Sequence, residues 1–89
     1  MKIDELSKKI IDEHLDAVKY NIEYKPMTDD EYGLIIIGDQ YAVYLSNERG
    51  GYHIIEYFQT EEDACDQLYE SLKAMKYVDD LVQMKKQTG

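Results

Sequence analysis

The chain contains few residues of the kinds that build disulfides, metal sites or catalytic centres. It has one cysteine, Cys65, one proline, no tryptophan and two histidines among 89 residues. A single cysteine cannot form an internal disulfide, which excludes the cross-linked frameworks of small secreted proteins. The histidines lie far apart and no Ser-His-acid set is present, so we expect no metal site, no cofactor and no enzymatic activity.

Basic residues are also scarce. Ten Lys and Arg stand against nineteen Asp and Glu, which gives a net charge of −9. Affinity for nucleic acid depends largely on Lys and Arg that displace counterions from phosphates, so direct nucleic-acid binding is disfavoured. The charge favours a basic partner. The alternative is that the excess charge only keeps the protein in solution.

Long apolar runs are absent. The first residues, MKIDELSKKII, include acidic residues from position 4 and no stretch long enough for a signal peptide or a membrane span. We therefore expect a cytoplasmic protein that does not contact membranes. The length predicts one domain, 1–89.

We expect residues 32–58 to form the centre of the fold. They read YGLIIIG, DQ, YAVYLS, NERGG and YHIIEYF in order, three runs of β-branched and aromatic residues separated by two breaks that contain glycine. This pattern is typical of a three-stranded antiparallel meander. Turns at 38–39 and 47–51 predict the pairs Ile37 with Gln40, Ser46 with Tyr52, Val43 with Ile55, and Tyr41 with Tyr57.

Helices are predicted on both sides of this sheet. From 4 to about 22, apolar residues recur every three or four positions, which predicts an amphipathic helix with Asp4 as its N-cap and His14 half-buried. Pro26 ends that segment, and 25–31 forms a loop whose acidic run, 29–31, is a solvated turn in preference to a cation site.

A second helix begins at Thr60, its predicted N-cap. Its inward stripe contains Ala64, Cys65, Leu68, Leu72 and Met75. Its outward side carries Glu62, Asp66 and Glu70 one turn apart, either as a partner surface or as a merely solvated face. A short final helix is expected from Asp79 to about Lys86. The fold class is α+β, in α-β-β-β-α order with this short C-terminal helix.

One sheet face remains without a cover in this arrangement. It is expected to hold Ile35, Ile37, Ala42, Tyr44, Ser46, Tyr52, Ile54 and Glu56. This face is too apolar to meet only water. Either the chain's own end, with Leu81, Val82 and Met84, covers it, or a protein partner does.

The order of elements matches the double-stranded RNA-binding domain. That fold carries basic residues at the start of its last helix to reach phosphates. Here the same position reads TEEDACDQ, so the charge is inverted and RNA binding is disfavoured.

From YAVYLSNERGGYHIIEYF into TEEDACDQLYESL, the chain resembles the small immunity proteins of bacterial polymorphic toxin and contact-dependent inhibition systems. The resemblance lies in a Tyr-rich hairpin with an ERG-type turn, followed by a Glu-rich helix start with an Ala-Cys pair, and covers less than half of the chain. It implies a cytosolic antitoxin that binds one cognate toxin domain, often a basic nuclease.

We choose the candidate partner-binding residues by their predicted exposure, because they match no known binding motif. They are Tyr44, Glu48, Arg49, Tyr52, Glu56, Glu62, Asp66 and Glu70. Two other classes of function remain open: a self-association module that dimerises through the uncovered sheet face, and a nucleic-acid mimic that inhibits through its carboxylate rows. The sequence does not determine the oligomeric state.

Overall fold

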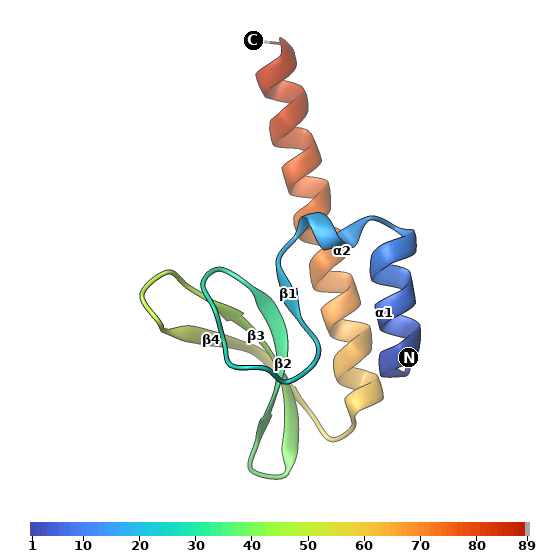
Figure 1. The fold of residues 1–89 in the computed structure, drawn as a ribbon, viewed down its shortest axis with the longest axis vertical. Coiled ribbons are helices and arrows are strands. Elements are labelled where there is room, and N and C mark those ends of the chain that lie inside the picture. The colour runs from blue at the N-terminus through green and yellow to red at the C-terminus, as the bar shows by residue number, and fades with distance from the viewer. Residues whose placement is uncertain (89) are drawn as a thin grey trace.

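The computed structural model describes residues 1–88, with side chains described through Gln83. The fold is α+β, with two α-helices and one four-stranded mixed sheet in the order β1-β2-β3-β4 (Figure 1). In chain order the elements are α1 (Ile3–Asp12), a 3₁₀ turn (Leu15–Ala17), β1 (Tyr20–Asn21), β2 (Tyr32–Ile37), β3 (Gln40–Ser46), β4 (Tyr52–Phe58) and α2 (Glu61–Thr88).

The helices build the core on one face of the sheet. Helix α2 contacts α1 as well as strands β2, β3 and β4, so it lies between the first helix and the sheet (Figure 1). The buried cluster draws on every one of these layers: Leu6, Ile10, Leu15, Val18, Ile22, Leu34, Val43, Ala64, Cys65, Leu68 and Leu72. No helix within the described residues is long and apolar enough to cross a membrane.

The predicted helix over 4–22 is wrong beyond Asp12. His14 adopts a left-handed conformation with φ of 58°, which ends α1, and a 3₁₀ turn and the two residues of β1 follow. Leu15 and Val18 are buried as expected, but a tight turn and extended chain place them there. The predicted cap is also wrong, because Lys2 occupies the N-cap and Asp4 lies in the first turn. His14 is exposed, not half-buried.

The antiparallel pairing of β2, β3 and β4 is present, and two predicted pairs are confirmed: Ile37 with Gln40, and Ser46 with Tyr52. The other two are wrong. A bulge between Val43 and Tyr44 shifts the register, so that Val43 pairs with Glu56 and Tyr41 with Phe58. A bulge adds one residue to one strand and moves later side chains to the other face.

Strand β1 was not predicted. It runs parallel to β2, with Tyr20 opposite Tyr32 and Asn21 opposite Gly33, and makes the sheet mixed. Two residues are too few to show a period in the sequence. The segment 22–31 that joins β1 to β2 contains neither helix nor strand, which agrees with the expected loop at 25–31.

The final helix is not a separate element. Helix α2 continues without a break through Asp79, and its C-terminal half projects beyond the rest of the molecule (Figure 1). Leu81 and Val82 are exposed on it, so they do not cover the sheet; the side chain of Met84 lies outside the described residues. The predicted start of α2 is confirmed, because the Thr60 hydroxyl accepts a hydrogen bond from the Asp63 N–H at 3.2 Å.

Candidate interaction surface

Three carboxylates form a row on the outward side of α2. Glu62, Asp66 and Glu70, four residues apart, are all exposed, whereas Leu68 and Leu72 on the inward side are fully buried. We call these three residues the acidic row. The spacing places them on successive turns of one helix face, as the sequence predicted.

Two members of the acidic row already contact cations. The Met1 amino group donates to the Asp66 carboxylate at 2.5 Å, and this hydrogen bond raises the pKa of that amino group. Glu70 lies 3.9 Å from the Lys73 ammonium, and both side chains are well exposed. Glu62 has no ion-pair partner among the described side chains. Such exposed pairs contribute little stability and can be exchanged for contacts with a partner, although these two cations offset part of the negative charge of the row.

A shallow depression lies beside the acidic row. Phe58, at the end of β4, and Asp63, Asp66, Gln67 and Glu70 of α2 line an open groove of about 330 Å³. We call it the acidic groove. An aromatic ring next to carboxylates suits a long basic side chain, whose stem packs on the ring while its charged head meets the carboxylates.

Three other predicted binding residues lie elsewhere. Glu48 and Arg49 are exposed in the turn between β3 and β4, and Tyr52 begins β4 with 49% of its surface exposed. Since Tyr52 and Phe58 stand at opposite ends of β4, about 20 Å separates them. The hairpin tip therefore lies away from α2 (Figure 1). The structure does not bring the two groups together.

Glu56 is exposed on β4 but not on the predicted sheet face. The bulge places it opposite Val43, whereas Tyr57, opposite Ala42, takes the position on the other face. Tyr57 is 49% exposed. The face expected to be uncovered therefore holds Tyr57 in place of Glu56.

Tyr44 is the one predicted binding residue that the structure contradicts directly. Its side chain is 1% exposed, and its ring lies over Gly33, where an added Cβ would come within 2.5 Å of the ring. The prediction was wrong because Gly33 leaves space for the ring. The sequence held a signal for this contact, because the predicted hairpin register already places Gly33 opposite Tyr44.

A buried polar network explains how that face is covered. The Tyr44 hydroxyl donates to Glu31 Oε2 at 2.6 Å and accepts from Asn21 Nδ2 at 3.0 Å. Ser46 Oγ donates to the Thr28 carbonyl at 2.6 Å. These bonds hold segment 22–31 over part of the face, so the acidic run at 29–31 is not simply a solvated turn: Glu31 is only 3% exposed.

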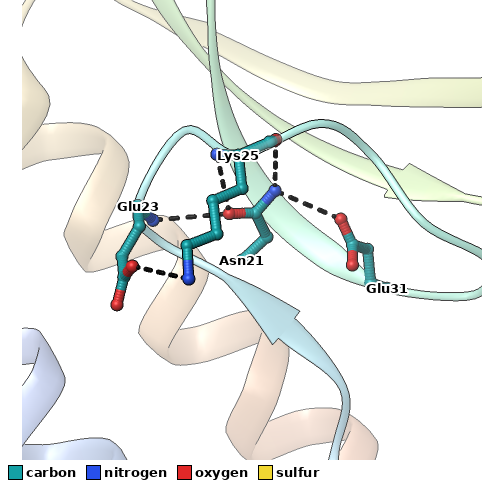
Figure 2. Close-up of polar contacts among 4 residues, drawn as sticks. All are labelled: Asn21, Glu23, Lys25 and Glu31. Carbon is teal, nitrogen blue, oxygen red and sulfur yellow. Dashed lines mark hydrogen bonds and ion pairs between the residues drawn. The ribbon is translucent and has the colours of Figure 1, made fainter.

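Asn21 fixes the path of this segment (Figure 2). Its side-chain amide donates to the Lys25 carbonyl at 2.7 Å and to Glu31 Oε2 at 3.3 Å, and its oxygen accepts from the Glu23 and Lys25 N–H groups. The described buried side chains contain no polar atom without a partner. We interpret the network as structural.

The ionisation of Glu31 follows from the same network. Burial opposes a charge there, but hydrogen bonds from the Thr28 hydroxyl, the Tyr44 hydroxyl and the Asn21 amide outweigh it and lower the pKa of the carboxyl group. Burial and the hydrogen bond to Glu31 raise the pKa of Tyr44. Both groups are therefore held in the protonation states that the hydrogen bond between them requires.

The single cysteine lies in the core and not at the surface. Cys65 is fully buried, and burial raises the pKa of its thiol to about 11, which is unfavourable for a nucleophile. Within the described residues, no three His, Cys, Asp or Glu side chains are grouped to hold a metal ion. The expectation of a non-enzymatic protein stays a prediction.

Some residues of the surface were missed by sequence reasoning. Phe58, Asp63 and Gln67 line the acidic groove, and none of them was among the predicted binding residues. Phe58 was missed because the bulge turns it toward the helices. A turn-based register carries no signal for a bulge in mid-strand.

Comparisons of the chain with models of protein families, with curated proteins and with solved structures gave no match.

Proposed function

We propose that this chain is an immunity protein, an antitoxin that binds and neutralises a cognate, basic bacterial toxin domain such as a nuclease. The observation that carries the proposal is the acidic row together with the acidic groove beside it. The resemblance of residues 41–72 to small immunity proteins supports the same function. The protein acts in this proposal through its surface, with no reaction of its own.

The negative charge of the surface favours fast association with a basic partner. A net charge of −9 on 89 residues gives the protein a strong field that attracts a basic partner from a distance. Opposite charge on two surfaces raises the association rate and selects against other acidic proteins. A neutralising protein benefits from fast association, because the toxin is active until it is bound.

The acidic groove accounts for anchoring. A Lys or Arg side chain of the partner packs on the ring of Phe58 and meets the carboxylates of Asp63 and Glu70. A basic side chain held in this way buries its stem against an aromatic ring while its charged head stays at the carboxylates, and such contacts to aromatic rings are common among residues that contribute most to affinity. The hairpin tip at 48–52 is a separate candidate contact.

Co-expression tests the function. The product of the neighbouring upstream reading frame is expected to co-purify with this protein and to arrest growth only in its absence. Reversal of the acidic row (Glu62→Lys, Asp66→Lys, Glu70→Lys) is expected to lower both co-purification and rescue of growth, because the basic partner then meets a basic helix face.

The matched control reverses three exposed carboxylates on the first part of the chain. Asp12→Lys, Asp16→Lys and Glu23→Lys change the net charge by the same amount, at exposed positions outside the acidic row and the acidic groove. This control is expected to rescue growth nearly as well as the unmodified protein. Failure of the unmodified protein to bind or rescue contradicts the proposed function, and equal loss with both triple variants contradicts the proposed surface.

A further inference from the structure

The projecting half of α2 carries apolar side chains that nothing in the described structure covers. Tyr77, Val78, Leu81 and Val82 are 65%, 50%, 39% and 44% exposed. We call these four residues the distal stripe. Met75 is the last of the described α2 side chains that packs on the core, and the helix continues for about 20 Å beyond it, projecting from the rest of the molecule (Figure 1).

The distal stripe is not a continuation of the inward stripe. At about 100° per residue, its centre is rotated by roughly 120° from the line through Leu68, Leu72 and Met75. The position that continues this line is Asp79, a charged residue. The chain's own core therefore ends at Met75, and the distal stripe faces a different direction.

The projecting half continues a helix that the core has already started, so it does not need to be nucleated again. Most helical stability in proteins comes from packing of an apolar face, and a partner on the distal stripe would add stability of that kind. Spacings of three and four, which join 78 to 81, 77 to 81 and 78 to 82, are those of a helix that packs on another helix. A second helix is the simplest cover for such a stripe.

We propose that the distal stripe binds the distal stripe of a second copy of this chain, with the two α2 helices antiparallel. A two-fold axis between positions 79 and 80 places Val78 opposite Leu81 at the centre of the contact, and places Tyr77 level with Val82 at its two edges. Every large side chain of the stripe then meets an apolar one. Asp79 and Asp80 lie roughly 130° from the centre of the stripe, so these like charges point away from the partner helix.

The charge distribution favours this part of the chain for contact between two copies, and it favours the antiparallel direction. Residues 73–88 contain four lysines and two aspartates, a net charge of +2. Because the whole chain has a net charge of −9, residues 1–72 carry a net charge of −11. The projecting half is thus the region where two such acidic molecules approach with least repulsion. The antiparallel arrangement keeps the two acidic bodies at opposite ends of the contact, whereas a parallel one places them side by side.

The contact is small. Four partly exposed side chains per copy lie below the roughly 800 Å² per partner of a standard interface, which predicts a reversible dimer with a dissociation constant on the order of 10–100 µM. The acidic row and groove lie on the first half of α2, so this inference is independent of the proposed function and its test needs no toxin.

Sedimentation velocity of the purified protein tests the dimer. Over concentrations from about 1 to 500 µM, the weight-average sedimentation coefficient is expected to rise from that of a monomer toward that of a dimer. Val78→Glu with Leu81→Glu is expected to keep the protein monomeric throughout. The control is Gln83→Glu with Asp79→Glu, on the same turns but away from the stripe, which is expected to dimerise like the unmodified protein.

Circular dichroism separates loss of the dimer from loss of the fold. The two changed residues lie outside the core, so the variant is expected to remain folded. A monomer at every concentration contradicts the proposal, and so does a dimer that survives Val78→Glu with Leu81→Glu.

Cysteine cross-linking tests the direction of the helices. A mixture of Val78→Cys protein and Leu81→Cys protein is expected to form the mixed disulfide dimer in preference to either symmetric one, since positions 78 and 81 lie level with each other and within about 30° of the centre of the stripe. Native Cys65 is buried and does not compete. Predominance of the dimer that joins two copies of position 78 contradicts the antiparallel arrangement.

Discussion

At the scale of single residues, Glu31 links the loop to the sheet. Its carboxylate accepts hydrogen bonds from Thr28 at 2.5 Å and from Tyr44 at 2.6 Å, and no Lys or Arg pairs with it among the described side chains. A buried carboxylate without a cation is stabilised only by such donors. The covering of the sheet face therefore depends on one ionised group.

The variant Glu31→Gln keeps the shape of this side chain and removes its charge. We expect it to lower the free energy of unfolding at neutral pH by about 1–3 kcal/mol, because charge-assisted hydrogen bonds become neutral or unmatched. Urea denaturation followed by tyrosine fluorescence measures the difference. Glu48→Gln, at an exposed turn position, is the control and is expected to leave stability unchanged.

The difference between Glu31→Gln and the unmodified protein should depend on pH. Since the folded state lowers the pKa of Glu31, its contribution is fully present above the unfolded value of about 4.3 and is lost as the pH falls through the folded value. The two stabilities are therefore expected to converge in acid. A constant difference from neutral to strongly acidic pH contradicts this role.

Tyr44 and Glu31 are two residues whose burial was not predicted from the sequence. Both were assigned to solvent from local pattern, and both are buried. Their partner Asn21 lies ten or more residues away from each, and its role depends on the loop that returns over the sheet. Spacing along a strand or a turn contains no information about such a contact.

At the scale of elements, His14 determines where the first helix ends. Its φ of 58° is in the left-handed region, which costs a residue with a Cβ roughly 1–2 kcal/mol and a glycine much less. The chain has no glycine or proline at this point to mark the end. The apolar spacing therefore predicted a helix that continued to residue 22.

The variant His14→Gly should stabilise the protein. We expect the free energy of unfolding to rise by about 0.5–1 kcal/mol, since glycine adopts this conformation without strain at the price of a more flexible unfolded chain. Lys8→Gly, at an exposed position inside α1, is the control and is expected to lower stability by about 1 kcal/mol. Thermal unfolding measures both; a loss of stability in His14→Gly contradicts the strain.

Turns and helix caps that contain characteristic residues were predictable from the sequence. Interruptions of a helix or strand that contain no such residue were not. Gly38 and the 47–51 turn fixed two strand pairs, and Thr60 marked the start of α2. The bulge beside Val43 inserts a residue, and no glycine in the sequence marks its position. Asp79 and Asp80 were interpreted as a helix start, but two aspartates on an exposed side are also compatible with a helix that continues.

At the scale of the whole molecule, charge is divided along the chain. Residues 1–72 are strongly acidic and the projecting half of α2 is slightly basic, so the negative charge is concentrated in one part of the molecule. The acidic row was predictable because four-residue spacing fixes a helix face. The groove beside it was not, because Phe58 reaches it only through the bulge.

The most direct test of the account is the rate at which the partner protein associates with this chain at different salt concentrations. With the product of the neighbouring reading frame as partner, stopped-flow measurements at about 20 mM and about 500 mM salt should show a steep fall in rate, because salt screens exposed charge. Reversal of the acidic row is expected to slow association at low salt by on the order of 10- to 100-fold and to remove most of the salt dependence, while reversal of Asp12, Asp16 and Glu23 leaves both largely intact. Equal rates for the two triple variants at low salt would contradict binding through the acidic face of α2.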